Sequence, residues 1–260
     1  MLNVSEKNEL RQIISSSLDR AEKQWQEGGH LLKASHPITS DSMNESVTNA
    51  AEPSKIPGHD IVRDGETVID EFVAFVADMR DSSKHLICAI SPKHADVSGL
   101  QRVYYETSAL LPALAYAVSK EKGSVTEYLG DGILALFRID ADSRDQAIYA
   151  SHRAAKNAIG DVRDLVNEAL FERYRLPTVD IGVGLACSKT LVTLVGLAPD
   201  KQPKAFGECV FRATKLSTGK NEVICDEKLK AIWPSSKGGM LRFSRKNLTN
   251  INGYIIGTAA

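Results

Sequence analysis

The sequence lacks the features of several protein classes. Its four cysteines form no CxxC pair, which argues against a zinc site or a disulfide framework. The net charge is −1, so no overall basic field attracts nucleic acid. The apolar run ALLPALAYAV is short and contains Pro112, and the start MLNVSEKNELRQ is too polar for a secretory signal. These absences predict a reduced, cytoplasmic protein that binds neither nucleic acid nor membranes.

What is present is the composition of a globular protein, with 43% apolar and 25% charged residues. Residues 1–33 are predicted to be an N-terminal helical segment, because apolar residues recur at helical spacing between Leu10 and Trp25. Residues 34–60 are rich in Ser, Thr, Asn and Pro and have no period, which predicts a linker. Residues 61–260 are left as one large domain.

The pattern in this domain favours an α+β fold, an antiparallel-rich sheet covered on one face by helices and similar to a split βαβ arrangement. The expected elements are strand 71–78, helix 99–121, a hairpin within 124–137, helix 143–171, a strand pair at 179–189 and 190–196, helix 209–219, strand 221–226 and a terminal hairpin.

Two aspartates lie where apolar strands end. Asp78 ends FVAFVAD, and Asp131 lies at the tip of the hairpin EYLGDGILALF. Taken alone, Asp-Gly is most simply a tight turn with positive φ angles. If the two strands are neighbours, however, both carboxylates emerge at one edge and repel each other unless a cation neutralises them. Mg²⁺ is typically held by one or two carboxylates plus substrate phosphates. A metal site and two unrelated strand ends both remain open.

Four stretches, in order, resemble the class III nucleotidyl cyclases, the adenylate and guanylate cyclase catalytic domains. FVAFVADMRDSS looks like the first metal strand of that family, and EYLGDGILALF looks like its second metal hairpin. IGVGLACSKTLVTLVG, residues 181–196, looks like the glycine-rich dimerisation hairpin, and FGECVFRATKL looks like the transition-state helix. The resemblance spans about residues 68–257 and implies a ferredoxin-like core.

The resemblance also implies a reaction. The ribose 3′-hydroxyl of a nucleoside triphosphate attacks the α-phosphorus and pyrophosphate leaves, with two divalent cations, Mg²⁺ or Mn²⁺, as cofactors. Asp78 and Asp131, together with Met79, would hold the metals. A homodimer would carry composite active sites, with the metals and the opposing positive charge on different subunits.

The proposed transition-state helix departs from the family pattern. Phe211 and Lys215 stand where the family has Asn and Arg, and Phe211 cannot orient a ribose by hydrogen bonding. Lys215 still offers a positive charge, and Arg212 would substitute if the helix is rotated. Arg80 is expected either to bind a phosphate or to be exposed to solvent. An active cyclase and an inactive cyclase-like module that binds a nucleotide or a partner both remain open.

The two base-selecting positions of the family fall on Glu127 and Lys204, which is neither the usual adenylate nor the usual guanylate pair. A carboxylate and an ammonium suit the pairing edge of uracil, although guanine also offers a donor beside an acceptor; Tyr104 or Tyr105 are the alternatives. DMRDSS and the altered helix resemble the bacterial pyrimidine cyclases of Pycsar antiphage systems. This resemblance implies conversion of UTP to 3′,5′-cyclic UMP as a messenger in antiviral defence, with a purine cyclase as the alternative.

Overall fold

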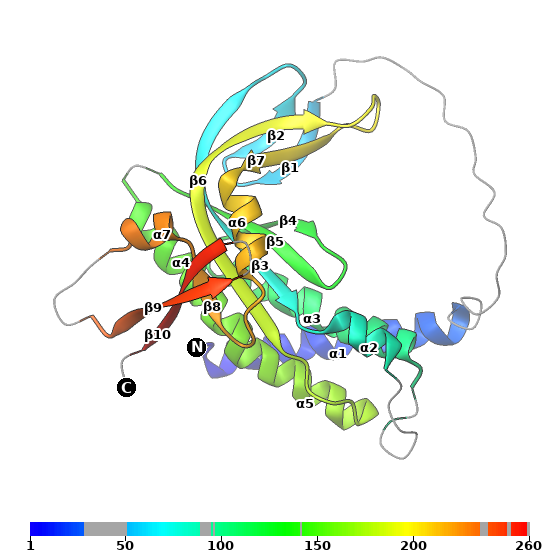
Figure 1. Ribbon diagram of the computed structural model, residues 1–260. Coiled ribbons are helices and arrows are strands. Elements are labelled where there is room, and N and C mark those ends of the chain that lie inside the picture. The colour runs from blue at the N-terminus through cyan, green and yellow to red at the C-terminus, as the bar shows by residue number, and fades with distance from the viewer. Residues whose placement is uncertain are drawn as a thin grey trace.

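The computed structural model of the chain describes residues 1–28, 51–88, 95, 97–140, 142–234, 239–248 and 251–258. Its central sheet has the strand order β4-β5-β3-β6-β8-β10-β9, with β7 paired to β6 (Figure 1). Neighbouring strands are antiparallel except for β6 and β8. The strands are β3 Val68–Met79, β4 Ser124–Tyr128, β5 Gly132–Arg138, β6 Ile181–Val195, β7 Gln202–Gly207, β8 Val223–Cys225, β9 Leu241–Leu248 and β10 Ile251–Thr258. The predicted α+β, antiparallel-rich fold is confirmed.

Helices lie on both faces of this sheet, whereas the sequence pattern predicted one covered face. The helices are α1 Val4–Gly28, α2 Ser82–Ile87, α3 Gly99–Lys120, α4 Arg144–Asn157, α5 Arg163–Tyr174, α6 Glu208–Leu216 and α7 Glu227–Ala231. Alternate residues of β3 explain the arrangement, because Phe75 packs with α3 and α4 while Phe72 packs in the cluster that includes α6. A strand that is apolar on both sides needs cover on both sides.

The N-terminal helix α1 packs against α3 and α5 and forms a further layer on that side of the sheet (Figure 1). Its buried residues Leu10, Ile14, Leu18 and Ala21 recur at helical spacing, as the sequence predicts. Ion pairs join α1 to its neighbours, among them Lys7 to Asp161 at 2.7 Å. Within the described residues, the helices are too short or too polar to cross a membrane.

The predicted linker over 34–60 is wrong in its last part. Strands β1 Ala51–Ile56 and β2 His59–Arg63 form an antiparallel hairpin. Ile56 and Val62 are buried in the cluster on the α6 face of the sheet, which holds the hairpin in place. Residues 34–50 lie outside the described residues.

The predicted strand pair over 179–196 is also wrong, because β6 is one continuous strand of 15 residues. It pairs with β3 along most of its length and with β7 near its end, so the hairpin is β6–β7 rather than a turn inside 181–196. The glycines serve packing: a Cβ on Gly184 would overlap the carbonyl oxygen of Ala213 in α6. The predicted helix 143–171 is interrupted by a π-helical turn, Ala158–Val162.

Candidate active site

The strand register brings the two aspartates together. Asp78 pairs with Gly132 across the antiparallel strands β3 and β5, so Asp131 lies beside it at the same edge. The Met79 amide donates a hydrogen bond to the Asp131 carbonyl at 3.1 Å. The positive φ angle in this hairpin is at Gly130, not at the Asp-Gly pair that the turn interpretation required. Gly132 is needed for another reason, since a Cβ there would overlap the Ala77 carbonyl.

The electrostatics of this pair favour a cation. Burial, and then the neighbouring charge of Asp131, raise the pKa of Asp78 to about 6. The Arg80 guanidinium donates to Asp78 Oδ2 at 2.6 Å and acts in the opposite direction, lowering this pKa. Among the described residues, the Arg80 guanidinium is the one cation paired with these two carboxylates, so the pair is short of positive charge, and a divalent cation would supply it.

The donor set fits Mg²⁺ or Mn²⁺, because both ions prefer hard oxygen ligands and Mg²⁺ is commonly bound by only one or two carboxylates. In the part of the chain that the structure describes, no group of three or more His, Cys, Asp or Glu side chains could form a metal cage. Met79 can contribute only its carbonyl oxygen, since its side chain is buried in the core and a thioether is a soft ligand.

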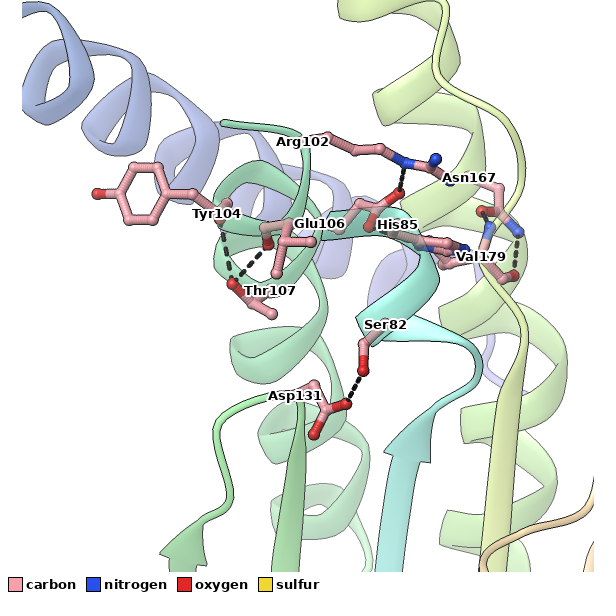
Figure 2. A network of polar contacts seen from close by, with 10 residues as sticks. Ser82, His85, Arg102, Tyr104, Glu106, Thr107, Asp131, Asn167 and Val179 are labelled. Carbon is pink, nitrogen blue, oxygen red and sulfur yellow. Dashed lines mark hydrogen bonds and ion pairs between the residues drawn. The ribbon is translucent and has the colours of Figure 1, made fainter. Parts of the chain in front are cut away.

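A polar network fixes the segment that follows Asp78 (Figure 2). The Ser82 hydroxyl, at the start of α2, donates to Asp131 Oδ2. His85 Nδ1 and Arg102 Nε both lie 2.8 Å from Glu106, whose side chain is fully buried. The His85 contact fastens α2 to α3, and Arg102 pairs with Glu106 within α3. None of these four residues was predicted from the sequence to have a role. The spacing of Arg102 and Glu106 by four residues is the sequence signal that indicates their ion pair.

The two predicted base-selecting residues form an ion pair. Lys204 Nζ on β7 lies 3.1 Å from Glu127 Oε2 on β4, and each side chain is about one-third exposed. The alternative residues belong to another part of the molecule: Tyr104 bonds to Gln24 of α1, and Tyr105 stacks on Tyr174 of α5.

The two predicted catalytic cations on helix α6 have different surroundings. Arg212 Nε donates to Glu208 in the preceding turn at 2.6 Å. Lys215 is exposed, and among the described residues no acidic side chain forms an ion pair with it. Phe211 is 67% exposed on the same helix. The end of α6 nevertheless reaches the aspartates, because Arg80 also donates to the Ser217 carbonyl at 3.4 Å. The expectation that Arg80 is simply solvent-exposed is therefore wrong.

No protein-family model matches the chain. A curated relative, the terminal-differentiation specific adenylate cyclase of Dictyostelium discoideum, is 31% identical over 117 residues, which are 44% of this chain and only 5% of the length of that protein. Similar solved structures include the guanylyl cyclase Cya2, with a TM-score of 0.56, 13% identity and coverage of 74% of this chain and 94% of that one. The adenylyl cyclase CyaB from P. aeruginosa has a TM-score of 0.57 and 12% identity, and the match covers 75% of this chain and 97% of that one. The chain thus has the class III nucleotide cyclase fold that the sequence predicted.

Proposed function

We propose that this protein is a metal-dependent nucleotide cyclase that converts a nucleoside triphosphate to a 3′,5′-cyclic monophosphate and pyrophosphate. The observation that carries the proposal is the juxtaposition of Asp78 and Asp131 at one sheet edge, within the fold of known cyclases. Structural carboxylates gain nothing from this placement, because burial and mutual repulsion disfavour their charge. A site that binds a divalent cation, in contrast, makes use of both carboxylates.

Asp78, Asp131 and the Met79 carbonyl would hold one or two Mg²⁺ or Mn²⁺ ions, which supply Lewis-acid activation of the 3′-hydroxyl and bind the triphosphate. The protein holds these ligands in place before substrate arrives, since Ser82 orients Asp131 and the buried Glu106 cluster fixes α2. Such preorganisation reduces the reorganisation needed to reach the transition state.

We favour UTP as the substrate because of the Glu127–Lys204 pair. A carboxylate can accept the N3 hydrogen of uracil while an ammonium donates to one of its two carbonyl groups. Guanine, with a donor beside an acceptor, is the competing base. Glu127→Ala should weaken discrimination among the four triphosphates, since a lost buried hydrogen bond costs about 1–3 kcal/mol. Product ratios that stay unchanged would place base selection elsewhere.

We further propose a homodimer with shared active sites. Apolar side chains on α6 and on the β6–β7 arm are exposed: Phe211, Phe206 and Leu197 are 67%, 45% and 87% accessible. Exposed large apolar side chains such as these can be buried by contact with a second copy. In such a dimer, Lys215 and Arg212 of one subunit would supply positive charge to the triphosphate bound at the aspartates of the other. A messenger role in antiviral defence rests on the resemblance to the bacterial pyrimidine cyclases.

The test is to incubate the purified protein with each of the four ribonucleoside triphosphates and Mn²⁺, and to identify cyclic products by mass. We expect cyclic UMP from the wild-type protein and none from Asp78→Ala or Asp131→Ala. Exposed Asp142→Asn serves as the matched control and should retain activity. Nucleotide binding without any cyclic product would support the second candidate, an inactive cyclase-like module, which the exposed Phe211 in place of a ribose-orienting amide favours.

A further inference from the structure

Arg80 contacts both parts of the candidate site. Its guanidinium donates to Asp78 Oδ2 at 2.6 Å and to the Ser217 carbonyl at 3.4 Å, and its side chain is only 25% exposed. The main chain of Arg80 is fixed as well, because its amide donates to the Asp180 carbonyl at 2.8 Å. The bond to Asp78 is therefore made by a held side chain and not by a freely moving surface arginine.

The second partner of Arg80 lies at the end of α6. Ser217 is the C-cap residue of this helix, where carbonyl groups lack helical partners and carry partial negative charge. The packing of strand β6 also places the end of α6 beside Asp78. A Cβ on Gly182 would overlap the Ser217 carbonyl, and Gly182 pairs with Asp78 across β3 and β6. Arg80 thus joins a proposed metal ligand to the helix that carries Lys215.

We propose that Arg80 is a resident cation of the site, which neutralises Asp78 in the metal-free protein and competes with the divalent ion for that carboxylate. The inference rests on the proposed function. When a divalent ion takes Asp78, the guanidinium moves off the carboxylate and the link between Asp78 and the end of α6 is broken. The charge of Arg80 then becomes available to a phosphate. Arg80 is in this sense a positioning residue that couples metal occupancy to α6.

The experiment measures Mn²⁺ binding to the full chain without nucleotide, from the electron paramagnetic resonance signal of free Mn²⁺. Because a partly exposed ion pair contributes at most about a fivefold change in a binding constant, Arg80→Ala should bind Mn²⁺ up to about fivefold more tightly than wild type. Arg80→Lys keeps the charge and should lie between the two. Lys220→Ala is the matched control, since it removes an exposed cation that pairs with Asp180 at 2.8 Å and not with Asp78.

Hydrogen exchange gives a second readout. Amides at the end of α6 and just beyond it, residues 215–219, should exchange faster in Arg80→Ala and in Mn²⁺-loaded wild type than in the metal-free wild type. Unchanged or weaker Mn²⁺ binding by Arg80→Ala, or tightening of the same size in Lys220→Ala, would overturn the proposal. If wild type makes cyclic product while Arg80→Ala shows no tightening, only this inference fails. If wild type makes no product with any triphosphate, the proposed function fails, whatever Arg80 does.

Discussion

Replacing Asp131 with asparagine should make the metal-free protein more stable at neutral pH, although it removes a proposed metal ligand. The substitution deletes the charge that repels Asp78 and keeps an oxygen that can accept the Ser82 hydroxyl. The geometry of the hairpin tip is also preserved, because the main-chain bond between Met79 and residue 131 does not involve the side chain. The variant therefore isolates the electrostatic cost of the carboxylate pair.

The magnitude follows from the pKa of Asp78. A rise from 3.8 to about 6 is about 2 units, which corresponds to about 3 kcal/mol before solvent screening. The Asp78 side chain is 30% exposed, so screening reduces this value to about half. Burial is the larger cause and Asp131 the second, so removing Asp131 should recover about 0.5–1 kcal/mol, or an increase of about 1–4 °C in Tm.

The sign of the pH dependence is fixed by the same shift. At pH 4, Asp78 is protonated in the folded chain whether or not residue 131 is charged, so the repulsion is absent and the variant and the wild type should be equally stable. As the pH rises through the raised folded pKa of about 6, the wild type loses stability and the advantage of the variant appears. Thermal unfolding in EDTA at pH 4 and pH 7.5 measures this, with Asp142→Asn as the control. An Asp131→Asn protein no more stable than wild type at pH 7.5, or equally stabilised at pH 4, would refute the reasoning.

Three further outcomes are expected. Glu106→Gln should lower the free energy of unfolding by about 3–5 kcal/mol in urea titrations, because it leaves the buried Arg102 without its counterion. Gly184→Ala should destabilise by about 1–3 kcal/mol and reduce turnover, since the new methyl group forces α6 off the sheet; an unchanged midpoint would show that α6 does not pack as described. Asp131→Ala and Lys215→Ala homodimers should each be inactive, but after subunit exchange roughly a quarter of all sites should be intact from two-fold symmetry. Absence of recovery, with exchange confirmed, would place the whole site within one chain.

The sequence was sufficient for the elements that carry strong patterns. β3 is apolar at every position from Phe72 to Ala77, and such a run is buried wherever it lies in the sheet. The placement of Asp78 and Asp131 at one edge followed from their positions at the ends of two apolar strands, and the register of β3 and β5 bears this out. Glu127 and Lys204 are also in contact, although only the family resemblance, and no local sequence pattern, predicted that these two residues share a site.

The misses share a physical cause, which is tertiary contact that overrides local pattern. The stretch AEPSKI contains Pro53 and Ser54, which are typical of loops. It nevertheless forms strand β1, because Ile56 at its end is buried against the sheet. The predicted break between residues 189 and 190 is absent, because β6 is one continuous strand; Gly184 lies inside it, and its small size lets α6 pack closely. Glu106 resembles an ordinary surface residue of a helix, and only the folded chain shows that Arg102 and His85 meet it in the core.

The charge balance of the site bears on the question of assembly. A triphosphate and two carboxylates bring more negative charge than two divalent ions neutralise, so further cations must come from the protein. Within one chain, Arg212 is engaged with Glu208, and Arg80 offers a single positive charge once a metal ion has displaced it from Asp78. Lys215, in contrast, projects from α6 beside the exposed Phe211, where its charge serves no ion pair among the described residues. An aromatic ring and an ammonium on the exposed face of one helix are suited to contact a partner surface that is apolar and carries a phosphate nearby. On the proposed function, a second copy of this chain meets both requirements, because it would cover Phe211 and place its own aspartates and their triphosphate within reach of Lys215.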